Sequence, residues 1–362
     1  RRHAVGLAGS FLDLAHLDAE ADRVGRVLRD QQGPVALRRR ITVEDLDRLQ
    51  AVLGPDLGEA AEDRGDPRRL DRIGAEGMTF TDHYAGNTVC APSRSVLMTG
   101  LHTGHTPIRG NQEVRPEGQW PLPASSHTLA EGLKEAGYVT GAFGKWGLGY
   151  PGSEGDPLNQ GFDRFFGTVC CPTTDWLYAY IEHNRVPVPP VGMIDKSPYP
   201  KNAYTNDFRP GWAAENFDAS EVDMVFLEKS RAFMREHVKA NPGKPLFLFH
   251  SMQAVHLPSI PAKQFRGKTE AGPHGDFIHQ MDWIVGALMD ELDGLGIADN
   301  TLVIFCSDNG PVLDDGKRPE VAEMASEASS IHRPVSRSSA WMPSITVPAR
   351  LKASACHTGC RG

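Results

Sequence analysis

Apolar positions between residues 221 and 306 follow two kinds of spacing. Residues 221–238 and 277–292 carry apolar side chains every three or four positions, which predicts two amphipathic helices. Residues 245–250 and 301–306 are almost continuously apolar, as is typical of strands that are covered on both faces. Helix, short loop and buried strand in this order predict an α/β fold, with a doubly wound, mixed and mostly parallel sheet flanked by helices.

The part of the chain before residue 216 adds two helices and a strand. Residues 93–99 and 127–136 show helical spacing, and each segment ends before a glycine, which favours a helix stop. Residues 138–143 predict a strand that leads into a glycine-rich turn. Residues 151–216 are rich in Pro, Asn, Gly and aromatic residues, so we expect a long ordered loop or a substrate-facing insertion there rather than regular structure.

The two ends of the chain differ in composition from the middle. Residues 1–72 hold 13 of the 27 arginines, no lysine and a single aromatic side chain, whereas residues 317–362 hold eight serines and a single aromatic side chain. Such segments have little to bury. We therefore expect three parts: an arginine-rich flank over residues 1–65, a patterned core over residues 66–316, and a tail rich in Ser and Pro over residues 317–362.

The average composition excludes several classes of protein. With a formal charge of −8 over 362 residues, the chain has no basic excess that would favour nucleic acid or an anionic membrane. No run of about 18 apolar residues occurs, so we expect no membrane-spanning helix. The six cysteines include no C-x-x-C pair, which argues against a structural zinc site and a disulfide scaffold. Because the first residue is Arg1, we expect the natural start and any export signal to lie outside this chain.

Chemically capable residues stand at helix starts and strand ends. Cys90 lies just ahead of a predicted helix, where unpaired backbone N–H groups favour an anion, and Arg94 is one turn away. His256 and the pair Asp308 and Asn309 follow the two buried strands, and reactive groups collect at the carboxyl edge of an α/β sheet. Taken singly, each has an ordinary interpretation as a buried cysteine, a loop histidine or a polar turn.

Four short motifs nevertheless occur in one order along the middle of the chain. Cys90-Ala91-Pro92-Ser93-Arg94, followed by Leu97-Met98-Thr99-Gly100 and Gly104-His105, resembles the first motif of the type I sulfatases of the arylsulfatase kind. Residues 137–146 resemble the second motif of that family, residues 255–258 its histidine loop and residues 307–310 its metal turn. The resemblance covers about residues 66–316 and implies the fold of the alkaline phosphatase superfamily.

The resemblance implies a specific chemistry. A formylglycine-generating maturation enzyme would oxidise Cys90 to formylglycine, and its hydrated aldehyde would attack the sulfur of a small-molecule or carbohydrate sulfate ester. Arg94 would stabilise this group, and Lys145 would bind a sulfate oxygen. His256 would contact the ester or protonate the leaving alcohol.

The metal site that the resemblance implies is only partly present in the sequence. Asp308 and Asn309 would supply oxygen ligands to Ca²⁺ or Mg²⁺. The acidic pair that completes such a site should fall near Gln50 and Ala51, which cannot replace carboxylates. Residues 43–53 predict an amphipathic helix rather than the buried strand that should carry this pair.

Two further departures bear on function. Gly147 stands where many members have a histidine, and no segment with a second sulfate-binding lysine is recognisable after Gly316. We therefore expect an incomplete fold and keep three hypotheses: a sulfatase, a phosphodiester or phosphonate monoester hydrolase of the same superfamily, and an impaired remnant that is inactive or only binds anions. The resemblance alone suggests a periplasmic or secreted location.

Overall fold

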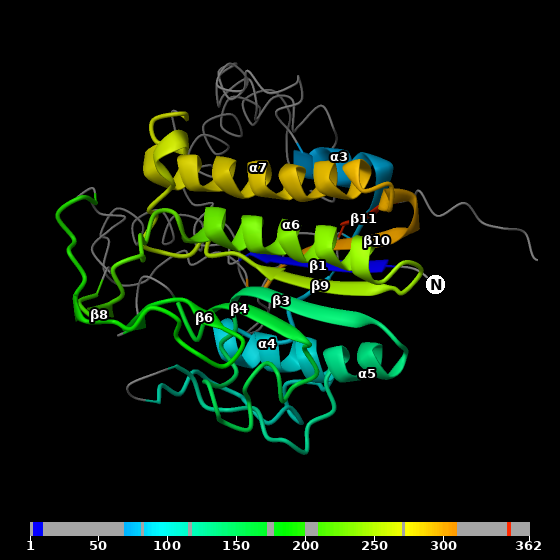
Figure 1. Cartoon of the computed structure of the whole chain (residues 1–362), viewed down its shortest axis with the longest axis horizontal. Helices are drawn as coiled ribbons and strands as arrows, with labels where there is room; N and C mark the ends of the chain where they lie inside the picture. The colour runs from blue at the N-terminus through cyan, green and yellow to red at the C-terminus, as the bar shows by residue number, and fades with distance from the viewer. Residues whose placement is uncertain are drawn as a thin grey trace, which may run out of the picture.

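A computed structural model of the chain describes residues 3–9, 69–80, 83–114, 118–171, 177–199, 209–269, 272–309 and 346–348 (Figure 1). Its centre is an eight-stranded sheet with the strand order β2-β11-β10-β1-β9-β3-β4-β6. Along the chain these strands are β1 (His3–Gly9), β2 (Gly77–Thr79), β3 (Val139–Lys145), β4 (Arg164–Thr168), β6 (Ile181–Glu182), β9 (Leu246–Ser251), β10 (Thr301–Ser307) and β11 (Thr346–Pro348).

The central strands of this sheet are parallel, and the antiparallel pairings lie toward its edges. β10, β1, β9, β3 and β4 pair in parallel, whereas β11, β2 and β6 join by antiparallel pairing. In the register, Gly9 lies beside Ser307 and Gly144 lies beside Ser251, so these strands end at one edge. The predicted mixed, mostly parallel sheet is confirmed.

Helices cover both faces of the sheet (Figure 1). The helices on one face are α3 (Arg69–Glu76), α6 (Val222–Ala240) and α7 (Gly272–Gly294), and those on the other are α4 (Cys90–Thr99) and α5 (Leu129–Glu135). Two short 3-10 helices, η3 (Lys263–Phe265) and η4 (Ala298–Asn300), lie in connections. The doubly wound arrangement is therefore confirmed. None of the helices in the described ranges combines the length and the apolar character that crossing a membrane requires.

Strand β9 shows why its sequence forms the middle of a sheet. Leu246 and Leu248 belong to the apolar core under α6 and α7, and Phe247 and Phe249 belong to the core under α4 and α5. Because alternate side chains of a strand point to opposite faces, two covered faces require an uninterrupted apolar run. Burial of each such side chain stabilises the fold by about 1.5–3 kcal/mol.

Local signals set the limits of the shorter helices. The Thr128 hydroxyl accepts the N–H of Glu131, and the Glu131 carboxylate accepts the N–H of Thr128, which caps the start of α5. α4 ends at Gly100, whose φ of 66° lies in the left-handed region that stops a helix. With shifted boundaries, the structure confirms the helices predicted over residues 93–99, 127–136, 221–238 and 277–292 and the strands predicted over residues 138–143, 245–250 and 301–306.

The segment 151–216 contains more regular structure than its composition indicates. β4 lies in it and pairs with β3 in the main sheet, so the prediction of a loop there is wrong. The same segment forms a separate three-stranded sheet of β5 (Leu177–Tyr178), β8 (Trp212–Ala213) and β7 (Gly192–Met193). Strands this short carry too few positions for an apolar alternation to separate them from loops.

The two terminal segments each contribute a strand to the main sheet. β1, from the arginine-rich flank, lies between β9 and β10, and β11, from the Ser- and Pro-rich tail, lies between β10 and β2. Composition indicated neither strand. An average over residues 1–72 hides the seven residues of β1, and an average over residues 317–362 hides the three residues of β11. The helix predicted over residues 43–53 lies outside the described residues.

Candidate functional site

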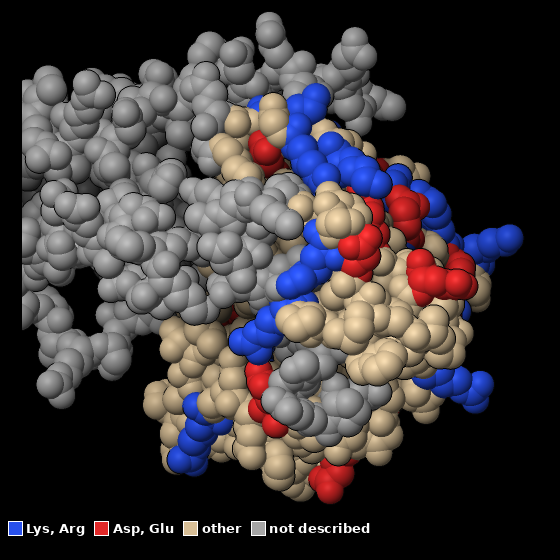
Figure 2. All heavy atoms as spheres, turned by 90° about the vertical axis from the view of Figure 1, so that its left-hand side faces the viewer, with Lys and Arg blue, Asp and Glu red and all other residues tan. Residues whose placement is uncertain are grey.

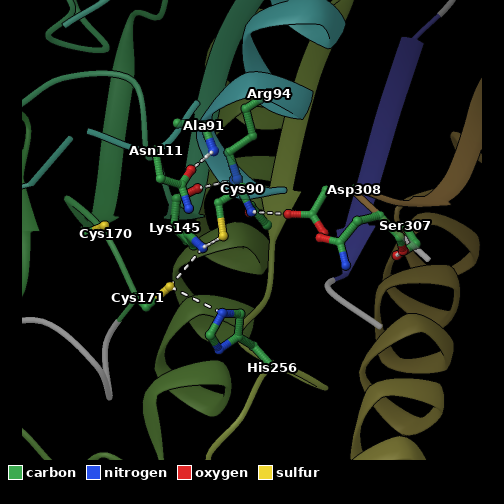
Figure 3. Close-up of polar contacts among 12 residues, drawn as sticks. Cys90, Ala91, Arg94, Asn111, Lys145, Cys170, Cys171, His256, Ser307 and Asp308 are labelled. Atoms are coloured by element: carbon green, nitrogen blue, oxygen red, sulfur yellow. Dashed lines mark hydrogen bonds and ion pairs between the residues drawn. The ribbon is translucent and has the colours of Figure 1, made fainter. Parts of the chain in front are cut away.

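The residues predicted to carry chemistry meet at the carboxyl edge of the sheet (Figure 3). Cys90 and Arg94 lie in the first turns of α4, Lys145 ends β3, and His256 lies in the loop after β9. Asp308 directly follows β10. His256 is partly exposed, and the other four side chains are buried. The fold thus brings together side chains that lie far apart in the sequence.

Cys90 is held in an uncommon backbone conformation. Its φ of 36° lies in the left-handed region, which costs a residue other than glycine about 1 kcal/mol or more. The N–H of the next residue, Ala91, donates to the side-chain oxygen of Asn111 at 3.2 Å and so braces the turn. Because Cys90 is the first residue of α4, it lies at the positive end of the helix dipole, where negative charge is favoured.

Lys145 links two cysteine side chains. Its ammonium donates to Cys90 Sγ at 3.0 Å and to Cys171 Sγ at 2.8 Å. Burial by itself would lower the pKa of Lys145, but the neighbouring sulfurs, Cys171 above all, outweigh burial and raise the pKa, so the ammonium stays charged. Gly144 makes this placement feasible: its φ is 110°, and a Cβ there would lie 1.8 Å from the carbonyl oxygen of Ser251.

Cys171 also contacts the predicted histidine. Cys171 Sγ lies 3.5 Å from His256 Nε2, and His256 Nδ1 makes a hydrogen bond with the carbonyl oxygen of Leu257. A carbonyl oxygen can only accept, so Nδ1 carries a proton and Nε2 is the nitrogen that faces the sulfur. The backbone therefore fixes the orientation of the imidazole ring.

The two thiols share negative charge unequally. Hydrogen bonds from the Cys170 and Cys90 thiols, helped by the positive charges of His256 and Lys145, lower the pKa of Cys171 well below the usual thiol range, although burial opposes this. The hydrogen bond to Cys171, together with burial, raises the pKa of Cys90. Burial would lower the pKa of His256, but the neighbouring Cys171 thiolate outweighs burial and raises it. The charge therefore resides on Cys171, between two cations.

Arg94 joins the ends of three strands. Its Nη1 donates to the Lys145 carbonyl oxygen at 2.6 Å and to Ser251 Oγ at 2.7 Å. Its Nη2 lies 3.6 Å from Asp308 Oδ2. Within the described ranges, Nε and Nη2 of this buried side chain have no hydrogen-bond acceptor. Since a buried donor without an acceptor costs about 1–3 kcal/mol, an anionic oxygen bound here would be stabilised.

Asp308 and Asn309 form a buried turn after β10. Ser307 Oγ donates to the Asn309 carbonyl oxygen at 2.7 Å and fixes the turn. A carboxylate and a side-chain amide are hard oxygen donors of the kind that Ca²⁺ and Mg²⁺ prefer, so the pair fits such a cation in type. Gly9, the last residue of β1, lies beside Ser307 at the rim of this turn. Residues 50 and 51, near which the resemblance places an acidic pair, lie outside the described residues.

Cys171 is the site residue that sequence reasoning missed. The pair Cys170 and Cys171 has no spacing that indicates a role, and the strand that precedes it, β4, was not predicted. Had β4 been recognised, a cysteine just after its carboxyl end would have pointed to this edge of the sheet. Gly147, which stands where many members of the resembled family have a histidine, lies against the arginine: a Cβ there would be 3.1 Å from Arg94 Cδ.

The arrangement is suited to binding a small anion. Arg94 and Lys145 supply two permanent cations, and His256 supplies a third charge when protonated, all near one nucleophile position. The face toward which the strand ends point carries a band of Lys and Arg side chains, with Asp and Glu between them (Figure 2). Cations at this edge of the sheet would attract an anionic ligand and neutralise charge that develops during a reaction.

Comparisons with known proteins show which proteins the chain is similar to. The family model described as Sulfatase matches residues 42–348. The N-acetylgalactosamine-6-O-sulfatase of Bacteroides thetaiotaomicron is 32% identical over 303 residues, which cover 70% of this chain and 56% of that protein. Arylsulfatase A of Bos taurus is 31% identical over 273 residues, which cover 71% of this chain and 49% of that protein. The chain spans about half the length of the curated relatives it matches.

Solved structures share the fold. A Bacteroides thetaiotaomicron structure from work on the metabolism of multiple glycosaminoglycans has a TM-score of 0.65 at 22% identity, covering 97% of this chain and 72% of that chain. The PsFucS1 sulfatase from Pseudoalteromonas sp. has a TM-score of 0.61 at 21% identity, covering 95% of this chain and 62% of that chain. At these identities the likeness concerns the fold alone, and it agrees with the mixed, doubly wound sheet.

Proposed function

Because this chain belongs to the type I sulfatase family, we propose that it hydrolyses sulfate esters at the cluster around Cys90. The observation that carries the proposal is the convergence of Arg94, Lys145 and His256 on Cys90 from separate segments of the chain. We further propose that residues 66–316 carry the catalytic residues, while β1 and β11 from the two flanks complete the sheet that positions them.

The side chain at position 90 is proposed as the nucleophile. Oxidation of Cys90 by a maturation enzyme would give the aldehyde of formylglycine, and addition of water to it would supply a hydroxyl nucleophile in place of the thiol. After the first hydroxyl has attacked sulfur and the alcohol has left, the second would lose its proton as the C–O bond to sulfate breaks, which restores the aldehyde. The surroundings suit such a group, because Lys145 already donates a hydrogen bond to Cys90 Sγ. An oxygen in the place of this sulfur would accept the same hydrogen bond. The spare donors of Arg94 lie in the same buried site and would stabilise an oxygen that carries negative charge.

Lys145 and His256 are proposed to act on the two ends of the ester. The charged Lys145 ammonium would bind a sulfate oxygen and hold the anion against Cys90. His256 Nε2 faces the cluster with its ring fixed by Leu257, and a raised pKa favours the protonated ring that can donate to the leaving alcohol. The partial exposure of His256 suits a residue that meets the alcohol part of the substrate as it enters.

Asp308 and Asn309 are proposed to hold a divalent cation, Ca²⁺ or alternatively Mg²⁺. The chemistry that such a cation supplies is neutralisation of the negative charge on the ester. Arg94 would orient the carboxylate, because its Nη2 approaches Asp308 Oδ2 while its Nη1 is anchored on the ends of β3 and β9. Two protein ligands leave room for further oxygen ligands around Ca²⁺, which takes about six to eight.

The proposed substrate is a carbohydrate or other small sulfate ester. Relatives named N-acetylgalactosamine-6-O-sulfatase and arylsulfatase A support this class and suggest a 6-sulfated N-acetylgalactosamine and an aryl sulfate as first substrates. The proposed partner is the formylglycine-generating enzyme that would act on Cys90.

The proposal is tested by co-expressing the chain with a formylglycine-generating enzyme and measuring both modification and turnover. Mass spectrometry of the peptide that contains Cys90 should show the oxidised side chain. The same sample should hydrolyse nitrophenyl sulfate faster than nitrophenyl phosphonate. Cys90→Ala should abolish turnover, whereas the control Cys306→Ala should retain it, since the Cys306 sulfur is not among the donor atoms that converge on Cys90.

Two outcomes would contradict the proposal. An oxidised Cys90 with turnover of the phosphonate but not of the sulfate would favour a phosphonate monoester or phosphodiester hydrolase. An unmodified Cys90 thiol without turnover, after a known sulfatase has been modified by the same preparation, would favour an impaired member of the family.

A further inference from the structure

Three soft donor atoms converge in the site, and the proposed hydrolysis uses only two of the residues that carry them. The side-chain donor atoms of Cys90, Cys171 and His256 all lie within 4.8 Å of one another. Thiolate and imidazole are the ligands that Zn²⁺ prefers, whereas Ca²⁺ and Mg²⁺ prefer oxygen. We propose that the chain with Cys90 in its thiol form binds Zn²⁺ or a similar soft divalent ion through Cys90, Cys171 and His256.

The distances already approach those of a zinc site. Bond lengths of about 2.3 Å to sulfur and 2.0 Å to nitrogen, at a tetrahedral angle, place a sulfur and a nitrogen ligand about 3.5 Å apart. Cys171 Sγ and His256 Nε2 are 3.5 Å apart. Two sulfur ligands of one tetrahedral ion lie about 3.8 Å apart, and Cys90 Sγ is within 4.8 Å of the other two atoms. Movements of about one ångström therefore suffice to bring all three donors onto one ion.

The histidine is oriented as a metal ligand. His256 Nδ1 donates to the carbonyl oxygen of Leu257, so Nε2 is the nitrogen directed toward Cys171, and release of its proton would turn its lone pair to an ion there (Figure 3). A backbone acceptor on the second ring nitrogen is the usual way in which proteins fix the tautomer of a ligating histidine. The ring therefore needs no rotation to bind an ion.

Lys145 stabilises the sulfur atoms in the form that binds a metal. Its ammonium donates to both Cys90 Sγ and Cys171 Sγ, and N–H donors to sulfur are a common outer shell of zinc–thiolate sites. Metal binding requires thiolates, so the ion would displace the protons that remain on Cys90 and His256. Two thiolates offset the ion's charge, and the fourth position stays open to water or an anion.

The donor set is independent of the proposed calcium turn. It contains no oxygen ligand, and neither Asp308 nor Asn309 belongs to it. It also needs the thiol of Cys90, so oxidation to formylglycine would remove one ligand. Zinc binding and maturation therefore compete for the same side chain, and a bound ion would shield Cys90 from oxidants and alkylating agents.

The test is titration of the unmodified full chain with Co²⁺, which substitutes for Zn²⁺ and reports thiolate ligands by a charge-transfer absorption band. One equivalent of Co²⁺ should produce the band, Zn²⁺ should remove it, and excess Ca²⁺ should not. Cys171→Ser should weaken Zn²⁺ binding by at least about tenfold, and the matched control Cys306→Ala should leave it unchanged. Absence of the band, or equal Zn²⁺ affinity in Cys171→Ser, would overturn the proposal.

A second measurement on the wild-type chain keeps the test decisive if a variant does not fold. Iodoacetamide labelling followed by mass spectrometry should show that Zn²⁺ protects both Cys90 and Cys171, whereas Ca²⁺ protects neither. Equal labelling of the two cysteines with and without Zn²⁺ would refute the site. Both measurements read the thiol form directly, so they are independent of whether the matured chain is active.

Discussion

The loop that carries His256 depends on one buried carboxylate, Asp223 in α6. Asp223 Oδ1 accepts the N–H of Gln253 at 2.6 Å, and Oδ2 accepts the N–H of Ala254 at 2.9 Å. The side-chain amide of Gln280 also donates to Oδ2, at 3.1 Å. The His256 N–H in turn donates to the Gln253 carbonyl oxygen at 2.8 Å, so the carboxylate holds the start of the turn in which the histidine lies.

Replacing this carboxylate by Asp223→Asn should remove a pH dependence of stability. Burial raises the pKa of Asp223 from 3.8 to about 6, and its hydrogen bonds oppose this only in part. Because the folded pKa lies above the unfolded one, the folded chain binds the proton more tightly, and stability rises as the pH falls through 6. From these two pKa values, lowering the pH from 7 to 5 raises the free energy of unfolding by about 1.3 kcal/mol through this group.

Urea unfolding of the wild type and Asp223→Asn at pH 7 and pH 5 measures this contribution. Between pH 7 and pH 5, the change in the free energy of unfolding should be about 1.3 kcal/mol less favourable for the asparagine variant than for the wild type. It should also reduce turnover of the matured chain, because an amide can serve only one of the loop's N–H groups as an acceptor. An identical difference between the two proteins at both pH values would show that Asp223 is not the group responsible.

Asp282→Asn is the matched control for this experiment. Burial also raises the pKa of Asp282 to about 6, and its carboxylate accepts the N–H groups of Arg69 and Leu70 at the start of α3. This variant should therefore change the pH dependence of stability in the same direction. Its effect on turnover should be small, because Asp282 binds the start of α3, whereas Asp223 binds the loop that carries His256.

Three further predictions concern the site and its support. In thermal unfolding, Gly144→Ala should destabilise the fold by more than about 3 kcal/mol, because its Cβ would lie 1.8 Å from the Ser251 carbonyl oxygen. The control Gly100→Ala has open space around its Cβ and should cost only about 1–2 kcal/mol. Arg94→Lys should lower turnover at least about tenfold while the chain still folds, since one ammonium cannot replace the forked contacts; unchanged turnover would remove Arg94 from the site. Chelation of Ca²⁺ should lower both turnover and melting temperature of the matured chain, and Asp308→Asn should abolish that response to the chelator, measured by calorimetry.

Sequence pattern was sufficient where an element is long and its burial is two-sided. The apolar run over residues 245–250 and the helical spacing of residues 277–292 each carry many positions, and the structure has a strand and a helix there. β4 and β1 were not predicted, because their five and seven residues lie inside segments of biased composition and are too few to show a clear apolar pattern. Their place in the sheet is decided by pairing with distant strands, which no local pattern encodes.

The site was predictable to the extent that its residues stand in recognisable strings. Cys90, Arg94 and Lys145 lie in two such strings, and the structure places them in hydrogen-bonded contact. Cys171 carries no local signal, since its role follows only from the chain turning back beside Lys145 after β4. Its charge state, which depends on four neighbours, is a property of the folded cluster and could not be read from sequence.

The position of β1 has a consequence for the order in which the protein can be made. Among the described elements β1 comes earliest in the chain, yet it pairs on one side with β9 and on the other with β10, and His3 Nδ1 accepts the N–H of Leu246 at a separation of 243 residues. Until β9 has been synthesised both edges of β1 lack their partners, and until β10 has been synthesised one edge still does; exposed strand edges invite pairing with other chains. Closing so long a loop is slow, so this sheet is completed late in synthesis, and a nascent chain that stops before Ser307 cannot form its central layer.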